Sequence, residues 1–189
     1  MTAPGTDPRR RNRGPAAAAD NRRALIAAGR EVFATEGLRA PFSAVAKRAG
    51  VGQGTLYRHF PDRLALAVAV FDENLSELER TAGAPHSTLG DLLDEVAAQA
   101  LPATALVQLL MNEHHDPRVR QLAERYEALI ARLLDRERAE GHVGPHIEPA
   151  DVAMATAMLA NVLAHLPEAE RDDASARGRR LFRAAFEPR

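Results

Sequence analysis

Residues 53–63 hold a dense group of side chains that could contact a polyanion. The group consists of Gln53, Thr55, Tyr57, Arg58, His59 and Arg63, and Gly54 lies among them. Gln53 can pair with an adenine edge, and Thr55 can bond to a base or touch a thymine methyl group, whereas the tyrosine, arginines and histidine suit phosphate oxygens. The glycine would let a ligand approach the backbone closely. This combination predicts a surface that reads double-stranded DNA.

Two short helices around a tight turn must position these side chains. We predict one helix over residues 41–50, with Pro41 in its first turn, and a second over 53–60, which Pro61 ends. Gly50 can adopt the left-handed conformation that such a turn requires. In a helix-turn-helix the second helix enters the major groove with its N-terminal end toward the bases. Ser43 and Lys47, on the first helix, are weaker candidates for DNA contacts.

The charge of the 189-residue chain is divided unevenly, although its formal net value is only −1. Residues 1–63 contain 12 Arg and Lys against 5 Asp and Glu, a net charge of +7, and residues 64–189 contain 13 against 21, a net charge of −8. The first segment is therefore the one expected to meet a polyanion. Its arginine arm either reaches an adjacent minor groove or is only a solvated tail. The arm contains Arg9, Arg10, Arg11 and Arg13.

Residues 20–70 resemble the tetracycline-repressor (TetR) family of bacterial transcription regulators. The resemblance rests on Ile26-Ala27-Ala28, Phe33, Gly37 and Val45-Ala46, and above all on the run AGVGQGTLYRHFPDR from Ala49 to Arg63. It implies that Gln53, Gly54, Thr55, Tyr57, His59 and Arg63 lie at the DNA, the last three mainly on phosphates. The chain departs from the family pattern at Pro41, where threonine is common, and at Arg63, where lysine is usual and the donor geometry differs.

The composition indicates an all-α protein. Its 38 alanines, 24 arginines and 22 leucines favour helices, and β-branched and aromatic residues are sparse. We expect about nine helices: one from residue 16 to Gly37, the helix-turn-helix pair, a long helix over 62–80 capped by Asp62, and then 88–101, 103–114, 117–140, 149–166 and 168–186. The expected organisation is a disordered basic arm (1–15), a DNA-binding domain (16–63) and a helical bundle (64–189).

The resemblance implies that this bundle dimerises and binds a small-molecule effector. Residues 151–165 are apolar nearly all round, and such a helix must be covered on every side, so we expect a second subunit to cover it. The predicted dimer interface comprises Ala153, Ala157, Ala160, Ala164 and Phe182. The predicted effector contacts are Gln108, Met111, His115, Tyr126, Met158 and Asn161.

Several other kinds of site are excluded or disfavoured by the sequence. The absence of cysteine excludes disulfides, thiolate metal sites and a cysteine nucleophile. His142 and His146 stand among glycine and proline, which disfavours a metal pair, and no cofactor motif is present. No signal peptide or membrane-spanning stretch is recognisable, so we expect a soluble cytoplasmic protein.

The sequence therefore favours a homodimeric DNA-binding regulator that acts as a repressor on a palindromic operator and is released by an effector. Two alternatives stay open. One is a helical adaptor without a DNA role, although such a protein would have no reason to present these donors together. The other, least favoured, is an all-α enzyme that uses Glu113, His114 and Asp116.

Overall fold

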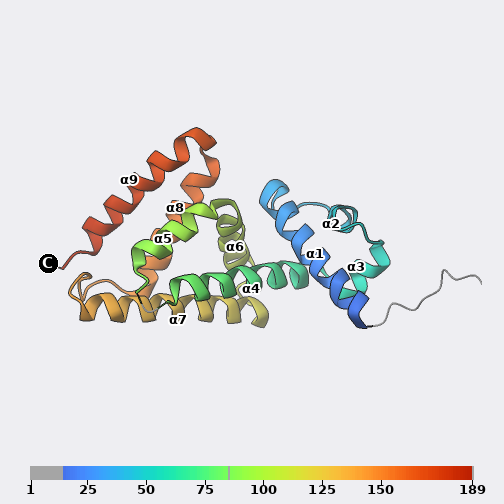
Figure 1. The fold of residues 1–189 in the computed structure, drawn as a ribbon, viewed down its shortest axis with the longest axis horizontal. Helices are drawn as coiled ribbons and strands as arrows, with labels where there is room; N and C mark the ends of the chain where they lie inside the picture. The colour runs from blue at the N-terminus through green and yellow to red at the C-terminus, as the bar shows by residue number, and fades with distance from the viewer. Residues whose placement is uncertain (1–14, 85, 189) are drawn as a thin grey trace, which may run out of the picture.

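The computed structural model describes residues 15–84 and 86–188, and within these ranges it contains nine α-helices and no strand (Figure 1). The all-α prediction is confirmed. The helices are α1 (Pro15–Glu36), α2 (Phe42–Arg48), α3 (Gln53–His59), α4 (Arg63–Ala82), α5 (Leu89–Ala98), α6 (Ala100–Asn112), α7 (Pro117–Ala139), α8 (Pro149–His165) and α9 (Glu168–Phe186). The arginines predicted to form a basic arm, Arg9, Arg10, Arg11 and Arg13, lie outside the described residues.

The helix boundaries follow local signals in the sequence. The Asp62 carboxylate accepts a hydrogen bond from the backbone N–H of Ala65 at 2.6 Å, and so caps α4 as expected. Thr88 and Asp91 form a reciprocal capping box at the start of α5. Pro102 differs from expectation, because it does not separate two helices but falls in the first turn of α6. A proline is tolerated there, since the backbone N–H groups of a first turn have no partner within the helix.

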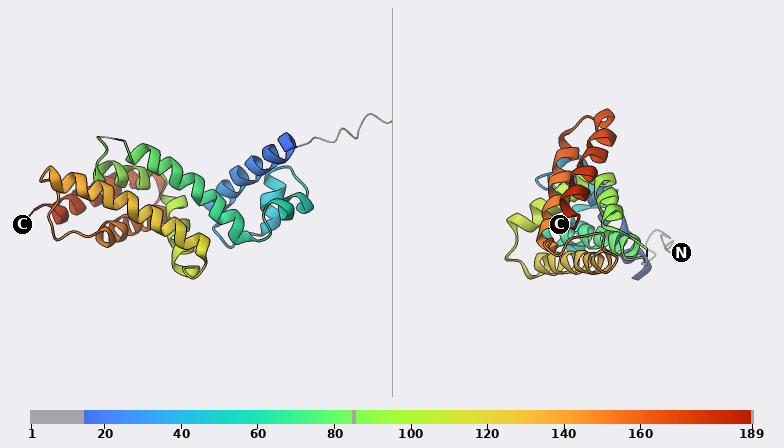
Figure 2. Two further views of the ribbon diagram at one scale, coloured as in Figure 1. Left: turned by 90° about the horizontal axis from the view of Figure 1, so that it is seen from below. Right: turned by 90° about the vertical axis from the view of Figure 1, so that its left-hand side faces the viewer.

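The long helix α4 connects the two ends of the molecule. Helices α1–α3 gather around its N-terminal end, and α5–α9 gather around the rest of it (Figure 1). Along this bundle α4 and α7 run side by side, and α9 lies at the outer edge (Figures 1 and 2). The part of the chain that is described contains no helix long and apolar enough to cross a lipid bilayer.

One apolar cluster joins the small N-terminal helices to the bundle. Leu25, Val45 and Leu56, from α1, α2 and α3, are fully buried, and the same cluster includes Leu109 of α6 and Leu122 of α7. A second cluster fills the far part of the bundle. Movement of α6 or α7 would therefore be felt by the helices that hold the predicted DNA-contacting surface.

Candidate functional site

Helices α2 and α3 form the helix-turn-helix that the sequence predicts. Gly50 has φ +67° in the turn between them, which lies in the left-handed region that favours glycine. The N–H of Val51 donates to the carbonyl of Ala46 at 3.0 Å and closes this turn. Because Val45 and Leu56 are fully buried, the opposite faces of both helices point to solvent.

The exposed face of α3 carries the polar residues of the predicted contact surface. Gln53, Gly54, Tyr57 and Arg58 are exposed, and Thr55 and His59 are part-buried. The Arg58 guanidinium lies back along the helix, where Nε donates to the carbonyl of Gly54 at 3.1 Å and Nη2 donates to Oγ1 of Thr55 at 3.0 Å. Tyr57 is 54% exposed.

The neighbouring elements complete this surface. Ser43 and Lys47 are exposed on α2, the first near its N-terminal end and the second close to the turn. The Phe42 ring packs edge-on against the ring of Tyr57, with centroids 5.4 Å apart, which steadies that side chain. Arg63, the first residue of α4, donates from Nη1 to the carbonyl of Leu38 at 3.0 Å. Arg63 is thus already anchored to the loop between α1 and α2, and its other N–H groups remain for a phosphate.

A clamp of charged groups fastens α4 to α7. Arg125 of α7 donates to both carboxylate oxygens of Glu79, at 3.1 and 2.7 Å. The same guanidinium bonds to Ser76 at 3.0 Å and pairs with Asp72, so that one α7 side chain holds three residues of α4. The hydrogen bonds from Arg125 lower the pKa of the Glu79 carboxyl against the opposing effect of its burial.

A second link joins the beginnings of α4 and α7. Asp116 caps α7 by accepting from the N–H of Arg118 at 2.9 Å, and it also receives two hydrogen bonds from the guanidinium, at 3.0 and 2.8 Å. These bonds lower the pKa of Asp116 to about 2. Arg118 Nη1 lies 4.0 Å from the Asp62 carboxylate, which caps α4. The carboxylate next to Arg63 is therefore tied to the bundle.

A mostly apolar cavity of about 300 Å³ lies inside the bundle and is bordered by α4, α5, α6, α7 and α8. We call it the bundle cavity. It is lined by Phe71, Asn74, Leu75, Leu78, Glu95, Val96, Gln99, Ala103, Val107, Ala123, Tyr126, Glu127, Ala153, Thr156, Ala157 and Ala160. The Tyr126 hydroxyl donates to Oγ1 of Thr156 at 2.8 Å, and Thr156 donates to the carbonyl of Ala153 at 2.9 Å. Burial raises the pKa of Tyr126 to about 12.

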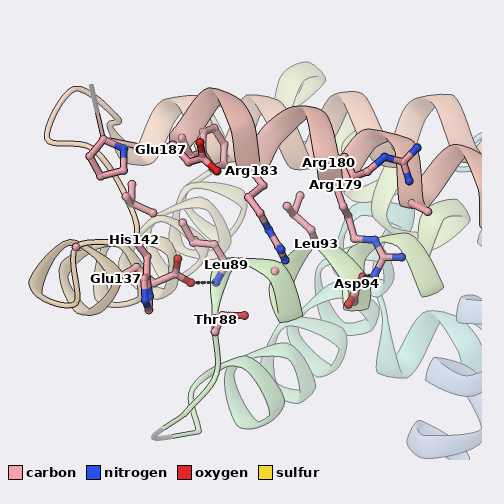
Figure 3. Close-up of a pocket in the computed structure, with 16 residues that line it drawn as sticks. Thr88, Leu89, Leu93, Asp94, Glu137, His142, Arg179, Arg180, Arg183 and Glu187 are labelled. Atoms are coloured by element: carbon pink, nitrogen blue, oxygen red, sulfur yellow. Dashed lines mark hydrogen bonds and ion pairs between the residues drawn. The ribbon is translucent and has the colours of Figure 1, made fainter.

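A larger, more polar cavity of about 740 Å³ lies at the far end of the molecule, between α5, α9 and the loop after α7. Figure 3 shows Arg183 extending from α9 toward the start of α5. There the buried Glu137 accepts a hydrogen bond from the N–H of Leu89 at 2.5 Å, and Arg179 pairs with Asp94 (Figure 3). The buried carboxylate at the start of α5 thus supports the helix itself.

Comparison with known proteins identifies the family. Residues 25–70 match the family model described as bacterial regulatory proteins, tetR family. The chain belongs to the TetR family. It is accordingly a DNA-binding transcription regulator and not an enzyme. A comparison with curated protein sequences finds no significant match.

Solved structures of TetR regulators share the fold over most of the chain. A TetR transcription regulatory protein from Mycobacterium vanbaalenii is 26% identical, with 91% of this chain and 98% of that chain covered and a TM-score of 0.61. A TetR transcriptional regulator from Streptomyces coelicolor is also 26% identical, with 88% and 98% covered and a TM-score of 0.59. A gamma-butyrolactone receptor (ArpA-like protein) is 18% identical, with 87% and 99% covered and a TM-score of 0.55.

The structure of this TetR-family chain does not bring the predicted effector contacts together. Of the six, Tyr126 lines the bundle cavity, whereas the exposed residues Gln108, His115, Met158 and Asn161 line neither cavity. The side chain of the sixth, Met111, lies outside the described part of the structure. Thr156, Glu95 and Gln99 line the bundle cavity but were not among the contacts predicted from the sequence. A signal for Thr156 was present, because it follows Ala153 by three residues and precedes Ala160 by four, and so shares their face of the helix.

The alanine stripe of α8, predicted to meet a second subunit, faces the interior of its own subunit. Ala153, Ala157 and Ala160 line the bundle cavity opposite Ala103 and Val107 of α6, and Ala160 is fully buried. Ala164 and Phe182 are part-buried. The small side chains allow α6 and α8 to approach each other closely, so the stripe serves packing within the chain.

The histidines considered as metal ligands have other neighbours. His142 Nδ1 lies 3.3 Å from Glu140, and His146 Nε2 lies 3.4 Å from the carbonyl of Ala185. Within residues 15–84 and 86–188, no three histidine or carboxylate side chains gather closely enough to hold a metal ion.

Proposed function

We propose that this TetR-family regulator is a repressor in the cytoplasm that binds a palindromic operator as a homodimer and is released by a small-molecule effector. The observation that carries the DNA-binding part is the exposed row of Gln53, Tyr57 and Arg58 on α3, above the fully buried Leu56. A helix held by its apolar face and polar on its outer face can enter a major groove without rearranging its core. The two half-sites would lie about 34–36 Å or a multiple apart.

Within this proposal the side chains have two tasks. Gln53 and Thr55 read base edges, whereas Tyr57, His59 and Arg63 hold phosphates and so set the position of α3, with Ser43 and Lys47 as weaker contacts. Arg58 joins them once DNA replaces its bonds along the helix. The same proposal divides the chain at residue 63, into a DNA-binding domain (16–63) and a regulatory bundle (64–189). The two parts share one apolar cluster, so they differ in proposed function but do not have separate hydrophobic cores.

The test is an electrophoretic shift with DNA from upstream of the protein's own gene. Gln53→Ala is expected to change base preference, whereas His59→Ala and Arg63→Ala are expected to weaken binding by a similar factor on all sequences. Arg63→Ala also removes a positive charge, so it is expected to reduce the salt slope by about 1. Arg132→Ala, an exposed residue on the C-terminal half of α7 and far from this surface, is the control. Failure to bind any inverted repeat at low salt would favour the adaptor alternative, and a uniform loss with Gln53→Ala would contradict the assigned roles.

The homodimer part of the proposal rests on the outer face of α8 and α9. Met154, Met158 and Val162 follow one another at four-residue intervals on α8, and together with Leu181 of α9 each is more than half exposed. Large apolar side chains gathered on two neighbouring helices are typical of an association surface. The interface is thus proposed on the face opposite to the alanine stripe.

Introducing a charge on this face tests the homodimer. Met158→Glu is expected to convert a dimer into a monomer of 20.5 kDa in sedimentation or light scattering, because a lone carboxylate would be buried in the interface. Gln121→Glu adds the same charge on exposed α7 and is expected to leave the dimer intact. A wild-type chain that is monomeric at the concentration of the shift assay would contradict this part.

Effector release is proposed because one helix reaches both sites. Phe71, Leu75 and Leu78 of α4 line the bundle cavity, and Arg63 at the start of the same helix lies at the DNA-contacting surface. A ligand that binds better to a conformer with a displaced α4 would shift the population away from the DNA-binding state. A structural relative that is described as a gamma-butyrolactone receptor supports a small-molecule signal.

A further inference from the structure

We propose that the bundle cavity binds an amphipathic amine, a compact apolar body with a positively charged head group, and discriminates against anions. The inference deepens the proposed function and rests on it only in treating this cavity as the effector site. It follows from three features of the cavity wall: its apolar floor, the direction of its buried hydrogen bonds, and the sign of its charged groups.

The apolar part of the wall defines the body of the ligand. Phe71, Leu75, Leu78, Val96 and Val107 supply large apolar side chains, and alanines from three helices supply flat surface. At the packing density of protein interiors, about 300 Å³ accommodates a molecule of about a dozen non-hydrogen atoms. Burial of such a body is the main source of affinity in a cavity of this kind.

The hydroxyl pair of Tyr126 and Thr156 can accept hydrogen bonds from a ligand but has no free proton to donate. The single proton of Tyr126 is donated to Thr156, and the single proton of Thr156 is donated to the carbonyl of Ala153. The lone pairs of the Tyr126 oxygen stay available, so a ligand group beside it has to be a donor. An ammonium group has three donors and an alcohol has one, whereas a carboxylate has none.

The charged residues of the wall are all acidic. Glu95 and Glu127 line the cavity, and no arginine, lysine or histidine is among its lining residues. The amide of Gln99 donates to Glu95 at 2.5 Å and holds that carboxylate in place. Arg80 interacts electrostatically with Glu95, but its hydrogen-bonded partner is Glu77. Two carboxylates near an apolar chamber attract a cation and repel an anion.

The far cavity carries charges of both signs. Arg179, Arg180 and Arg183 line it together with three carboxylates, and among the described residues only Arg179 of the three arginines forms an ion pair. An anionic compound could therefore associate with the protein there without entering the bundle cavity. A test of selectivity therefore has to measure binding in the bundle cavity alone. Displacement of an amine that is already bound there by the competing compound meets this requirement.

The experiment uses three compounds with one phenylbutyl body and different head groups: 4-phenylbutylamine, 4-phenylbutan-1-ol and 4-phenylbutyrate. Calorimetry on the full chain without DNA measures the amine and the alcohol, and displacement of bound amine measures the carboxylate. The amine is expected to bind about tenfold more tightly than the alcohol, because it gains two nearby carboxylates. The carboxylate is expected to displace the amine only at concentrations about tenfold above those of the alcohol.

Variants assign this selectivity to the wall. The double substitution Glu95→Gln and Glu127→Gln is expected to bring the amine to within about twofold of the alcohol, because only the charge term is removed. Glu124→Gln removes an exposed α7 carboxylate that does not line the cavity, and is expected to change neither compound. Tyr126→Phe is expected to weaken both amine and alcohol by about fivefold through loss of the acceptor. Thermal unfolding of each variant without ligand confirms that it is folded.

The outcomes separate this inference from the proposed function. Equal displacement by the carboxylate, unchanged amine preference in the double variant, or no binding of any of the three compounds would overturn the ligand class, whatever the protein does on DNA. If the amine binds with the expected selectivity but does not release the operator in the shift assay, the ligand class stands and the effector role of the cavity falls.

Discussion

Replacing Arg125 by methionine tests whether the charged clamp between α4 and α7 stabilises the fold. The substitution keeps an unbranched apolar stem and a similar helix propensity but removes every hydrogen bond to Glu79, Ser76 and Asp72. The side chains of Arg125 and Glu79 are only 27% and 28% exposed, so their two-pronged pair is screened less than a surface pair. The pair with Asp72, which is 55% exposed, contributes little.

These contributions give an expected loss of about 2 kcal/mol in the free energy of unfolding, because charge-assisted hydrogen bonds at a partly buried site exceed the surface value of under about 1 kcal/mol. For a chain of this length the melting temperature should fall by about 4–8 °C. Arg177→Met is the matched control. Its i, i+4 pair with Asp173 is 67% and 74% exposed, and its loss should cost at most about 0.5 kcal/mol.

The pH dependence gives an independent check through Glu79. Its folded-state pKa lies below the ordinary value of 4.5, chiefly because Arg125 donates to it. A carboxyl with a depressed pKa stabilises the fold above its unfolded-state pKa, and this contribution is lost as the pH falls through the folded-state value. The difference in melting temperature between wild type and Arg125→Met should therefore be constant between neutral pH and about 5 and should shrink below about 4. A shift no larger than that of Arg177→Met, or one that grows on acidification, would refute the reasoning.

Three further substitutions have defined outcomes, each measurable by thermal or urea unfolding. Gly50→Ala should lower the free energy of unfolding by about 1 kcal/mol, because the residue has φ +67°. No atom lies within 4 Å of the added Cβ, so the loss comes from backbone conformation and not from a clash, and an unchanged stability would contradict this account. Gly54 lies in α3 with open space around it, so Gly54→Ala should raise the free energy of unfolding by about 0.5 kcal/mol while weakening operator binding. A variant that is more stable and also binds the operator more tightly would contradict this prediction. Glu137→Ala should cost about 2 kcal/mol by leaving the N–H of Leu89 unpaired, whereas Glu137→Gln, which keeps an acceptor, should cost less than half as much.

The helices were predictable from the sequence to within a few residues, because glycine, proline and capping side chains act locally. Asp62, Pro117 and Pro149 mark helix starts through groups that the first turn leaves unpaired. The boundary near Pro102 was misplaced, since a proline signals either a break or a first turn and only the packing of α6 decides between them.

The orientation of α8 was less predictable, for a different reason. Periodicity shows that Ala153, Ala157 and Ala160 share one face of a helix, but in a helix apolar all round it does not show which face meets the rest of the subunit. The structure places α6 against the alanines and leaves Met154 and Met158 outside. Small side chains were a cue to close helix packing, and that cue applies equally within a chain and between two chains.

The cavity residues depend on contacts between segments far apart in the sequence. Tyr126 was among the predicted contacts, but its partner Thr156 lies 30 residues away, and nothing in the local sequence joins them. The α4 side of the clamp was predictable from the sequence, because Asp72, Ser76 and Glu79 recur at helical spacing and so form a polar stripe on one face of that helix. The identity of Arg125 as the residue that meets this stripe required the three-dimensional arrangement.

The chain contains two tyrosines and no tryptophan, and the structure places one tyrosine at each proposed site. Tyr57 stands exposed on α3, and Tyr126 is part-buried in the wall of the bundle cavity. Intrinsic fluorescence of the protein is therefore the sum of two reporters, one for the DNA-contacting surface and one for the cavity. Tyr57→Phe would leave Tyr126 as the sole emitter in the chain, so occupation of the cavity could be followed optically on unlabelled protein while DNA is bound.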